Sequence, residues 1–335
     1  MRQPEEQAPH ASGRGFLRGE YLGLAGALLV LILFFGLQSE YFWSPLTFTT
    51  LANQIPALTV IAVGMTFVLI IAGIDLSVGS VMALSGSVLG LAIMDMHAPL
   101  WLAAVFCLAT GLACGAFNGL VVTRWGVPSF IVTLGMLEIA RGGAYLATGS
   151  QTKYIGAAVE AVSAPLPGIN LSPALFLAIA VVVLGQFLLT RTIFGRRMIA
   201  VGTNEEAVHL SGINVARVKL MVFSMGGMLA GLGGLFHVGY LQSADPNAGI
   251  GLELSAIAAV VVGGTSLSGG KGSVVNTLLG VLIIAVLQTG LAQIGASEPT
   301  KRVITGLVII AAVILDVYRN RSGGIGSYFK QVLKP

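Results

Sequence analysis

The sequence predicts an all-α membrane protein, a bundle of about ten transmembrane helices, and three observations support this fold class. Of the 335 residues, 55% are hydrophobic and only 10% are charged, whereas soluble domains carry about 25% charged residues. Long apolar runs recur along the chain, each close to the roughly 20 residues that a helix needs to cross a bilayer. The 45 glycines suit transmembrane helices that pack closely.

Ten apolar segments account for the expected helices. They lie near residues 21–37, 53–73, 78–95, 99–122, 128–148, 173–190, 216–239, 254–268, 273–295 and 302–318. The segments near 78–95 and 254–268 are short and rich in glycine, which predicts broken or re-entrant helices there. The expected organisation is a tail over 1–20, a transmembrane domain over 21–318 and a tail over 319–335.

The distribution of lysine and arginine predicts the orientation of the chain. If the first tail is inside the cell, most basic residues fall in inner connections, and only Lys153, Lys301 and Arg302 fall in outer ones. Inner loops of membrane proteins carry the excess of basic residues. We therefore expect both termini and the polar loop over 191–215 to be cytoplasmic.

This polar loop, part of the stretch from Thr190 to Lys219, carries signals for a helix outside the membrane. The signals are an N-cap, two acidic residues in the first turn and a terminator: Asn204, Glu205, Glu206 and Gly212. They predict a short helix over 204–211. Because so short a helix is marginal alone, we expect it to dock on a partner. A solvated loop that obeys the positive-inside rule is the alternative.

No nucleotide, metal or catalytic motif is complete in the chain. The stretch over 263–273 contains Gly270-Lys271-Gly272, but a Walker A loop requires Ser or Thr after the lysine. A glycine-rich turn between two spans explains this stretch better. The four histidines lack metal-ligand spacing. We expect no cofactor, no metal, no nucleic acid and no enzyme activity in this chain.

Three ionisable residues at or beside the apolar segments are candidate functional groups: Asp75, Glu138 and Arg141. Asp75 precedes Ser77 and the segment near 78–95, so it either caps that helix or contacts a transported species at a helix break. Glu138 and Arg141 are three residues apart on one helix face. They either neutralise each other or serve transport, and the sequence favours neither.

Four blocks of the chain carry a family pattern. The blocks are Ala72-Gly73-Ile74-Asp75-Leu76-Ser77-Val78-Gly79-Ser80, then Asn118-Gly119 followed by Pro128–Gly135, then Thr192–Val215 with Phe194-Gly195-Arg196, and Glu253–Ser273. With these blocks the chain resembles the ribose-type monosaccharide permeases of bacterial ATP-binding-cassette importers over nearly the whole chain after about residue 45. Related permeases share such blocks while importing different sugars, so the resemblance does not identify the sugar.

The resemblance implies an inner-membrane permease that moves a ribose-like pentose, a hexose or a related small polyol by alternating access. Its implied partners are a second copy of this chain, two cytoplasmic ATP-binding subunits, which hydrolyse ATP, a periplasmic sugar-binding protein and the lipid bilayer. The implied ATPase-coupling residues are Phe194, Gly195, Arg196, Asn204, Glu205, Glu206, Leu210 and Gly212. The candidate helix-break or pathway residues are Asp75, Ser77, Asn118, Glu138 and Arg141.

The main alternative is an ion-coupled secondary sugar transporter. Such a transporter needs buried carboxylates for its coupling ion, and the expected interior offers only Asp75, Asp95 and Glu138, with Asp95 near the end of a segment. A membrane-bound enzyme is a third hypothesis, but the chain lacks a catalytic group of residues.

Overall fold

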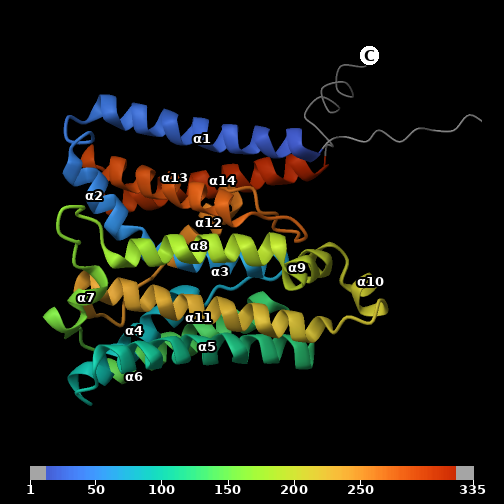
Figure 1. The fold of residues 1–335 in the computed structure, drawn as a ribbon, viewed down its shortest axis with the longest axis horizontal. Helices are drawn as coiled ribbons and strands as arrows, with labels where there is room; N and C mark the ends of the chain where they lie inside the picture. Colours follow the sequence, from blue (N-terminus) through green and yellow to red (C-terminus); the bar gives the residue numbers. More distant parts are fainter. Residues whose placement is uncertain (1–12, 322–335) are drawn as a thin grey trace, which may run out of the picture.

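The computed structural model describes residues 13–321, which form a bundle of helices along one axis (Figure 1). Most of the two predicted tails lies outside the described residues. The helices are α1 (Gly13–Gln38), α2 (Pro45–Gln54), α3 (Pro56–Ile70), α4 (Val78–Met94), α5 (Leu100–Trp125), α6 (Ser129–Thr148), α7 (Glu160–Ser163), α8 (Pro173–Arg191), α9 (Ile193–Thr203), α10 (Glu205–Leu210), α11 (Val215–Leu241), α12 (Leu252–Val262), α13 (Val274–Gln293) and α14 (Glu298–Arg321). A 3-10 turn, η1, covers Gly156–Val159.

The predicted all-α membrane fold is confirmed, and each of the ten apolar segments contains helix over most of its length. Within residues 13–321, five helices are long and apolar enough to cross a bilayer: α5, α6, α8, α11 and α13. The helices α2 and α3 together form a sixth candidate span, bent by 45° where Pro56 begins α3. The shorter apolar helices are α4, α12 and Leu22–Gln38 of α1.

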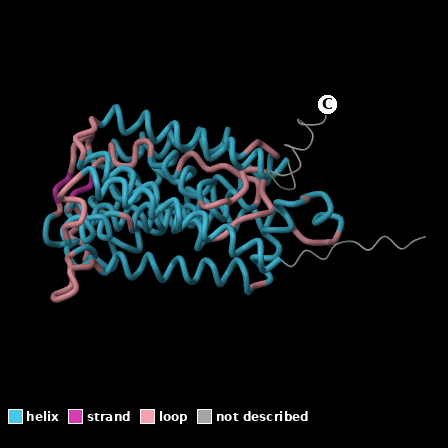
Figure 2. Tube along the Cα trace, turned by 90° about the horizontal axis from the view of Figure 1, so that it is seen from above, coloured by secondary structure: helices cyan, strands magenta, loops and turns pink. Residues whose placement is uncertain are grey.

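The helices form layers across the bundle, with α1 at one edge and α5 and α6 at the other (Figure 1). Between these edges lie α13 and α14, then α12, α3 and α8, and then α11 and α4. α3 occupies the centre, where all its residues except Leu58 are buried. Strands β1 (Lys153–Tyr154) and β2 (Ser243–Ala244) pair antiparallel at one end of the bundle (Figure 2). The first residues of α1, the last of α14, and α10 all lie at the opposite end (Figure 1).

The segments near 78–95 and 254–268 hold short helices that follow non-helical backbone, in line with the predicted broken or re-entrant helices, and we call them the two broken spans. Their helices, α4 with 17 residues and α12 with 11, are only about 25 and 16 Å long at 1.5 Å per residue. Non-helical segments over 71–77 and 245–251 lead into them. The second segment follows α4 through the bundle, because Ala244 lies against Gly90 and Gly249 lies against Gly79.

Glycines let α5 and α11 approach backbone to backbone. The predicted stripe Gly111, Gly115 and Gly119 on α5 faces α11, where Gly227 and Gly231 oppose it. A Cβ atom on Gly227 would lie 2.7 Å from both N and Cα of Gly115. Since lipid offers no hydrophobic drive between helices, close packing of this kind must hold the pair together.

We expect Gly227→Ala to destabilise the bundle by about 1–3 kcal/mol, because the added methyl group forces two backbones apart. Gly135→Ala on α6 is the matched control, since a Cβ atom there meets nothing within 4 Å. Thermal unfolding of both variants in detergent measures the difference. Equal melting temperatures for the two variants would contradict the assigned packing.

Candidate functional site

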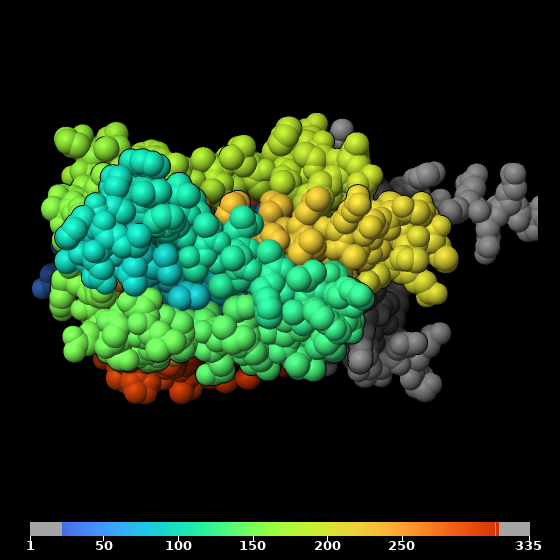
Figure 3. Space-filling view, turned by 90° about the horizontal axis from the view of Figure 1, so that it is seen from below, coloured from blue at the N-terminus to red at the C-terminus, as the bar shows by residue number. Residues whose placement is uncertain are grey.

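The predicted helix over 204–211 is confirmed as α10, which protrudes from one end of the bundle (Figures 1 and 3). Asn204 caps it, and its Oδ1 accepts a hydrogen bond from Ala207 N at 2.9 Å. Gly212 follows with φ of +82°, a left-handed conformation that favours glycine at helix ends. The sequence signals therefore gave the correct bounds to within a residue.

The structure contains a second helix in the polar loop, α9, which the sequence analysis did not predict. Thr192 caps it by accepting a hydrogen bond from Gly195 N at 3.1 Å. Gly195 packs against carbonyl groups at the end of α8, while Met198 and Val201 are buried on the same side of α9. The signal for α9 was the threonine cap followed by these two apolar residues. Phe194 is half-buried on this helix and Arg196 is exposed.

Every α10 residue except Val208 is exposed. Leu210 is 80% exposed. Glu205 is held by Lys219 of α11, whose Nζ lies 2.6 Å from Oε2, so this carboxylate fastens α10 to the bundle. A hollow of about 490 Å³ lies beside α10, lined by Glu205, Glu206, His209, Leu210 and Val215. We call Glu206, His209 and Leu210 the α10 surface.

A groove of about 600 Å³ extends from α10 into the bundle. Its walls are the segments 71–74 and 126–130, together with Glu205, His209 and Lys219. The groove therefore links the exposed loop helix with the break that precedes α4.

The break before α4 brings three of the candidate residues together. Asp75 Oδ1 accepts hydrogen bonds from Ser77 N at 2.8 Å and Ser77 Oγ at 2.6 Å. Asp75 thus fixes Ser77, the residue directly before α4, and no amide of the first turn of α4 is its partner among the described residues. Asn118 of α5, fully buried, donates to Ser77 Oγ at 3.1 Å.

Side chains from α6 bind the extended backbone of this break. Ser129 Oγ accepts a hydrogen bond from Ile74 N at 3.0 Å, and Thr133 Oγ1 accepts one from Leu76 N at 3.1 Å. These hydroxyl groups replace the backbone partners that a continuous helix would supply.

Glu138 and Arg141 share a face of α6, but no ion pair joins them within the described residues. Arg141 donates instead to the carbonyl oxygens of Pro246 and Ala248, at 2.9 Å for the latter. Arg141 therefore holds the segment that leads into α12. Glu138 is exposed midway along α6.

The two broken spans meet inside the bundle at a position that the sequence did not reveal. Glu253, in the first turn of α12, accepts a hydrogen bond from Gly251 N at 3.2 Å through Oε1. Its other oxygen lies against Gly79 in the first turn of α4, which no side chain caps. A carboxylate is favourable at a helix N-terminus. We call the contact of Gly79, Gly249 and Glu253 the half-helix crossing.

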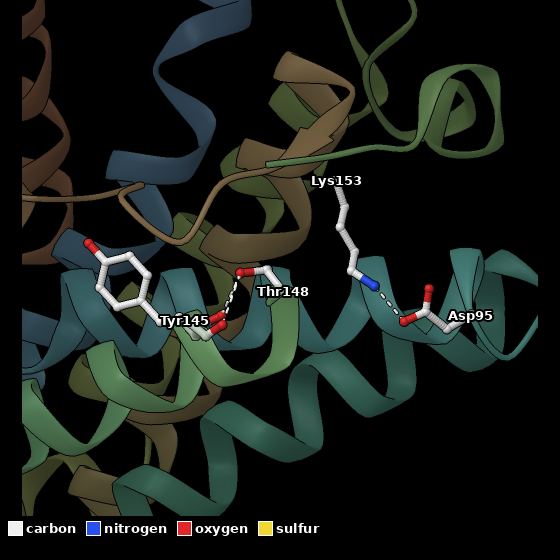
Figure 4. Close-up of polar contacts among 5 residues, drawn as sticks. Asp95, Tyr145, Thr148 and Lys153 are labelled. Carbon is white, nitrogen blue, oxygen red and sulfur yellow. Dashed lines mark hydrogen bonds and ion pairs between the residues drawn. The ribbon is translucent and has the colours of Figure 1, made fainter. Parts of the chain in front are cut away.

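The opposite end of the bundle carries a different polar contact. Lys153 of β1 forms an ion pair with Asp95, the residue that ends α4 (Figure 4). The neighbouring Tyr145 hydroxyl donates to Asn247 Oδ1 at 2.6 Å. The ion pair fastens the end of α4 to β1, and the Tyr145 hydrogen bond fastens the segment 245–251 to α6.

The chain is similar to known permeases over most of its length. The family described as "Branched-chain amino acid transport system / permease component" matches residues 47–313. The ribose import permease protein RbsC of Escherichia coli (strain K12) is 40% identical over 297 residues, covering 87% of this chain and 91% of that protein. The fructose import permease protein FrcC of Rhizobium meliloti is 34% identical, with coverages of 86% and 82%. The L-arabinose ABC transporter permease protein AraH of Azospirillum brasilense is 34% identical, with coverages of 89% and 87%. No solved structure matches the chain.

We expect Gly79→Ala to separate the half-helix crossing, because its Cβ atom would lie 2.5 Å from Glu253 Oε2 and even closer to Gly249 O. Forcing these groups apart costs about 1–3 kcal/mol. Gly142→Ala is the control, since its Cβ atom meets nothing within 4 Å. A melting temperature for Gly79→Ala that equals the control value would show that the crossing is not tightly packed.

Proposed function

Because the chain belongs to the family of branched-chain amino acid transport system permease components, we propose that it is the membrane subunit of an ATP-driven importer. The cargo that we propose is a monosaccharide, a ribose-like pentose, a hexose or a related small polyol. The observation that carries this choice is the 40% identity to a ribose import permease over 87% of the chain. Fructose and L-arabinose permeases among the relatives support a sugar over an amino acid.

The energy for import enters at the α10 surface. The chain carries no complete nucleotide motif, so ATP must be hydrolysed by another subunit. An exposed Leu210 beside Glu206 and His209 offers an apolar centre with a polar rim, the usual anatomy of a protein interface. Two ATP-binding subunits would dock here, one on each copy of the chain, on the cytoplasmic side.

Glu138 supports the pairing of two copies. A carboxylate midway along an apolar helix is costly against lipid, yet Glu138 is exposed in the single chain. A second copy of this chain, with a polar pathway between the copies, would remove that cost. Asp75, Ser77, Asn118 and Arg141 lie around the two breaks that such a pathway would open and close by alternating access. The end with the strand pair would then face the periplasm and receive the sugar-binding protein.

Reconstitution tests the proposed function directly. Liposomes would contain this chain together with its ATPase subunit and its sugar-binding protein, and uptake of D-ribose, D-fructose, L-arabinose and L-leucine would be measured. We expect ATP-dependent uptake of a sugar and none of leucine. Sugar uptake by the chain alone under an ion gradient would instead establish the secondary-transporter alternative.

Glu206→Lys should weaken docking of the ATPase subunit at least tenfold, because it reverses a charge on the α10 surface. Glu160→Lys is a matched control, since Glu160 is also exposed in the first turn of a short helix, α7, at the other end of the bundle. Both changes carry the same cost at a helix N-terminus, about 0.3–1 kcal/mol. Co-purification of the ATPase subunit measures docking, and equal recovery with both variants would refute docking at α10.

Glu138→Leu should lower ATP-driven uptake at least tenfold, while Glu138→Gln should retain most of it. The reason is that glutamine still presents a polar side chain to the proposed pathway, whereas leucine does not. If Glu138 faced lipid, leucine would suit that surface better than glutamate. Full uptake by Glu138→Leu would therefore remove this face of α6 from the pathway.

A further inference from the structure

Three backbones meet at Gly202, in the last turn of α9. A Cβ atom on Gly202 would overlap the carbonyl oxygen of Ile70 and lie 2.5 Å from Gly270 N. Ile70 and Gly270 are themselves joined, since Gly270 N–H donates to Ile70 O at 2.9 Å. Only a glycine at position 202 permits this approach.

The loop over 263–273 is shaped around the end of α9. Gly269 and Gly270 have φ of +84° and +73°, conformations that residues with a Cβ atom adopt rarely. A Cβ atom on Gly269 would lie 2.8 Å from Gly202 O, and one on Gly270 would lie 2.5 Å from Thr203 Oγ1. The loop is therefore seated on α9 along two consecutive residues.

Each partner of Gly202 leads to one of the broken spans. Ile70 ends α3, and the segment 71–77 runs from it to α4. Gly270 lies between α12 and α13. The N-terminal turn of α4, which follows the segment 71–77, touches the N-terminal turn of α12 at the half-helix crossing. α9 is therefore connected to both half-helices, α4 and α12, and these two helices also contact each other.

This arrangement differs from ordinary helix packing in the bundle. The close contact between Gly115 and Gly227 joins two full spans, α5 and α11. Gly202 instead belongs to the loop helix next to α10, with only Asn204 between the two helices. Packed backbones leave no side chain that could rearrange to absorb a displacement.

We propose that Gly202, Ile70 and Gly270 form a joint that transmits movement of α9 and α10 to the half-helices α4 and α12 together. The inference rests on the proposed function, because the movement would originate in ATPase subunits docked at α10. Gly202 is a positioning residue in this scheme, since it contacts neither the sugar nor ATP.

Gly202→Ala tests the joint in the complete complex with the ATPase subunit and binding protein. Gly306→Ala on α14 is the control, because a Cβ atom at Gly306 meets nothing within 4 Å. We expect Gly202→Ala to retain the ATPase subunit and ATP hydrolysis, while D-ribose, D-fructose or L-arabinose uptake per ATP falls at least tenfold. A ratio of uptake to hydrolysis within twofold of the control would overturn the proposal.

Hydrogen exchange in the wild-type complex tests the same joint without a variant. On addition of a non-hydrolysable ATP analogue, we expect exchange to change in 70–77 and 263–273 together with 193–210. A change confined to 193–210 would overturn the joint. An absence of ATP-driven uptake by the wild-type complex would instead refute the importer, so the two failures are distinguishable.

Discussion

Close approach of backbones at glycine residues is the constraint on which this bundle depends. In a bilayer, apolar side chains gain little by leaving the lipid for contact with one another, so helices associate through complementary shape and close contact. Gly111, Gly115 and Gly227 bring α5 against α11 in this way. The same physical device holds the half-helix crossing at Gly79 and the loop helix at Gly202. The same close approach of backbones at glycine therefore supports both the packing of the bundle and the proposed transmission of movement.

Breaking two spans creates a second requirement, because non-helical backbone inside a membrane protein must find hydrogen-bond partners within the protein. The break before α4 finds them on α6, in Ser129 and Thr133. The segment leading into α12 finds one in Arg141, which accounts for a charged residue at that depth of α6. Glu138 has no such structural duty among the described residues, so of the two it is the stronger candidate for the proposed pathway.

The local features of the chain were predictable from the sequence, and the contacts between distant segments were not. The ten helical segments and α10 follow from hydropathy and from the cap at Asn204. The short helices α4 and α12 follow from their length and glycine content. The structural role of Glu253 could not be predicted, because it depends on a contact with Gly79, which lies 174 positions earlier in the sequence. The ion pair of Glu205 with Lys219 was missed for the same reason, and it leaves Glu206 and Leu210 as the freer part of α10.

The most direct test of the coupling mechanism is a pair of cryo-electron microscopy structures of the complete complex, with and without a non-hydrolysable ATP analogue. We expect the ATPase subunit to contact Glu206 and Leu210 in both states. We also expect α4 and α12 to shift as one unit with α9, relative to the packed pair α5 and α11. An ATPase subunit that binds away from α10, or half-helices that stay fixed while α9 moves, would contradict the mechanism.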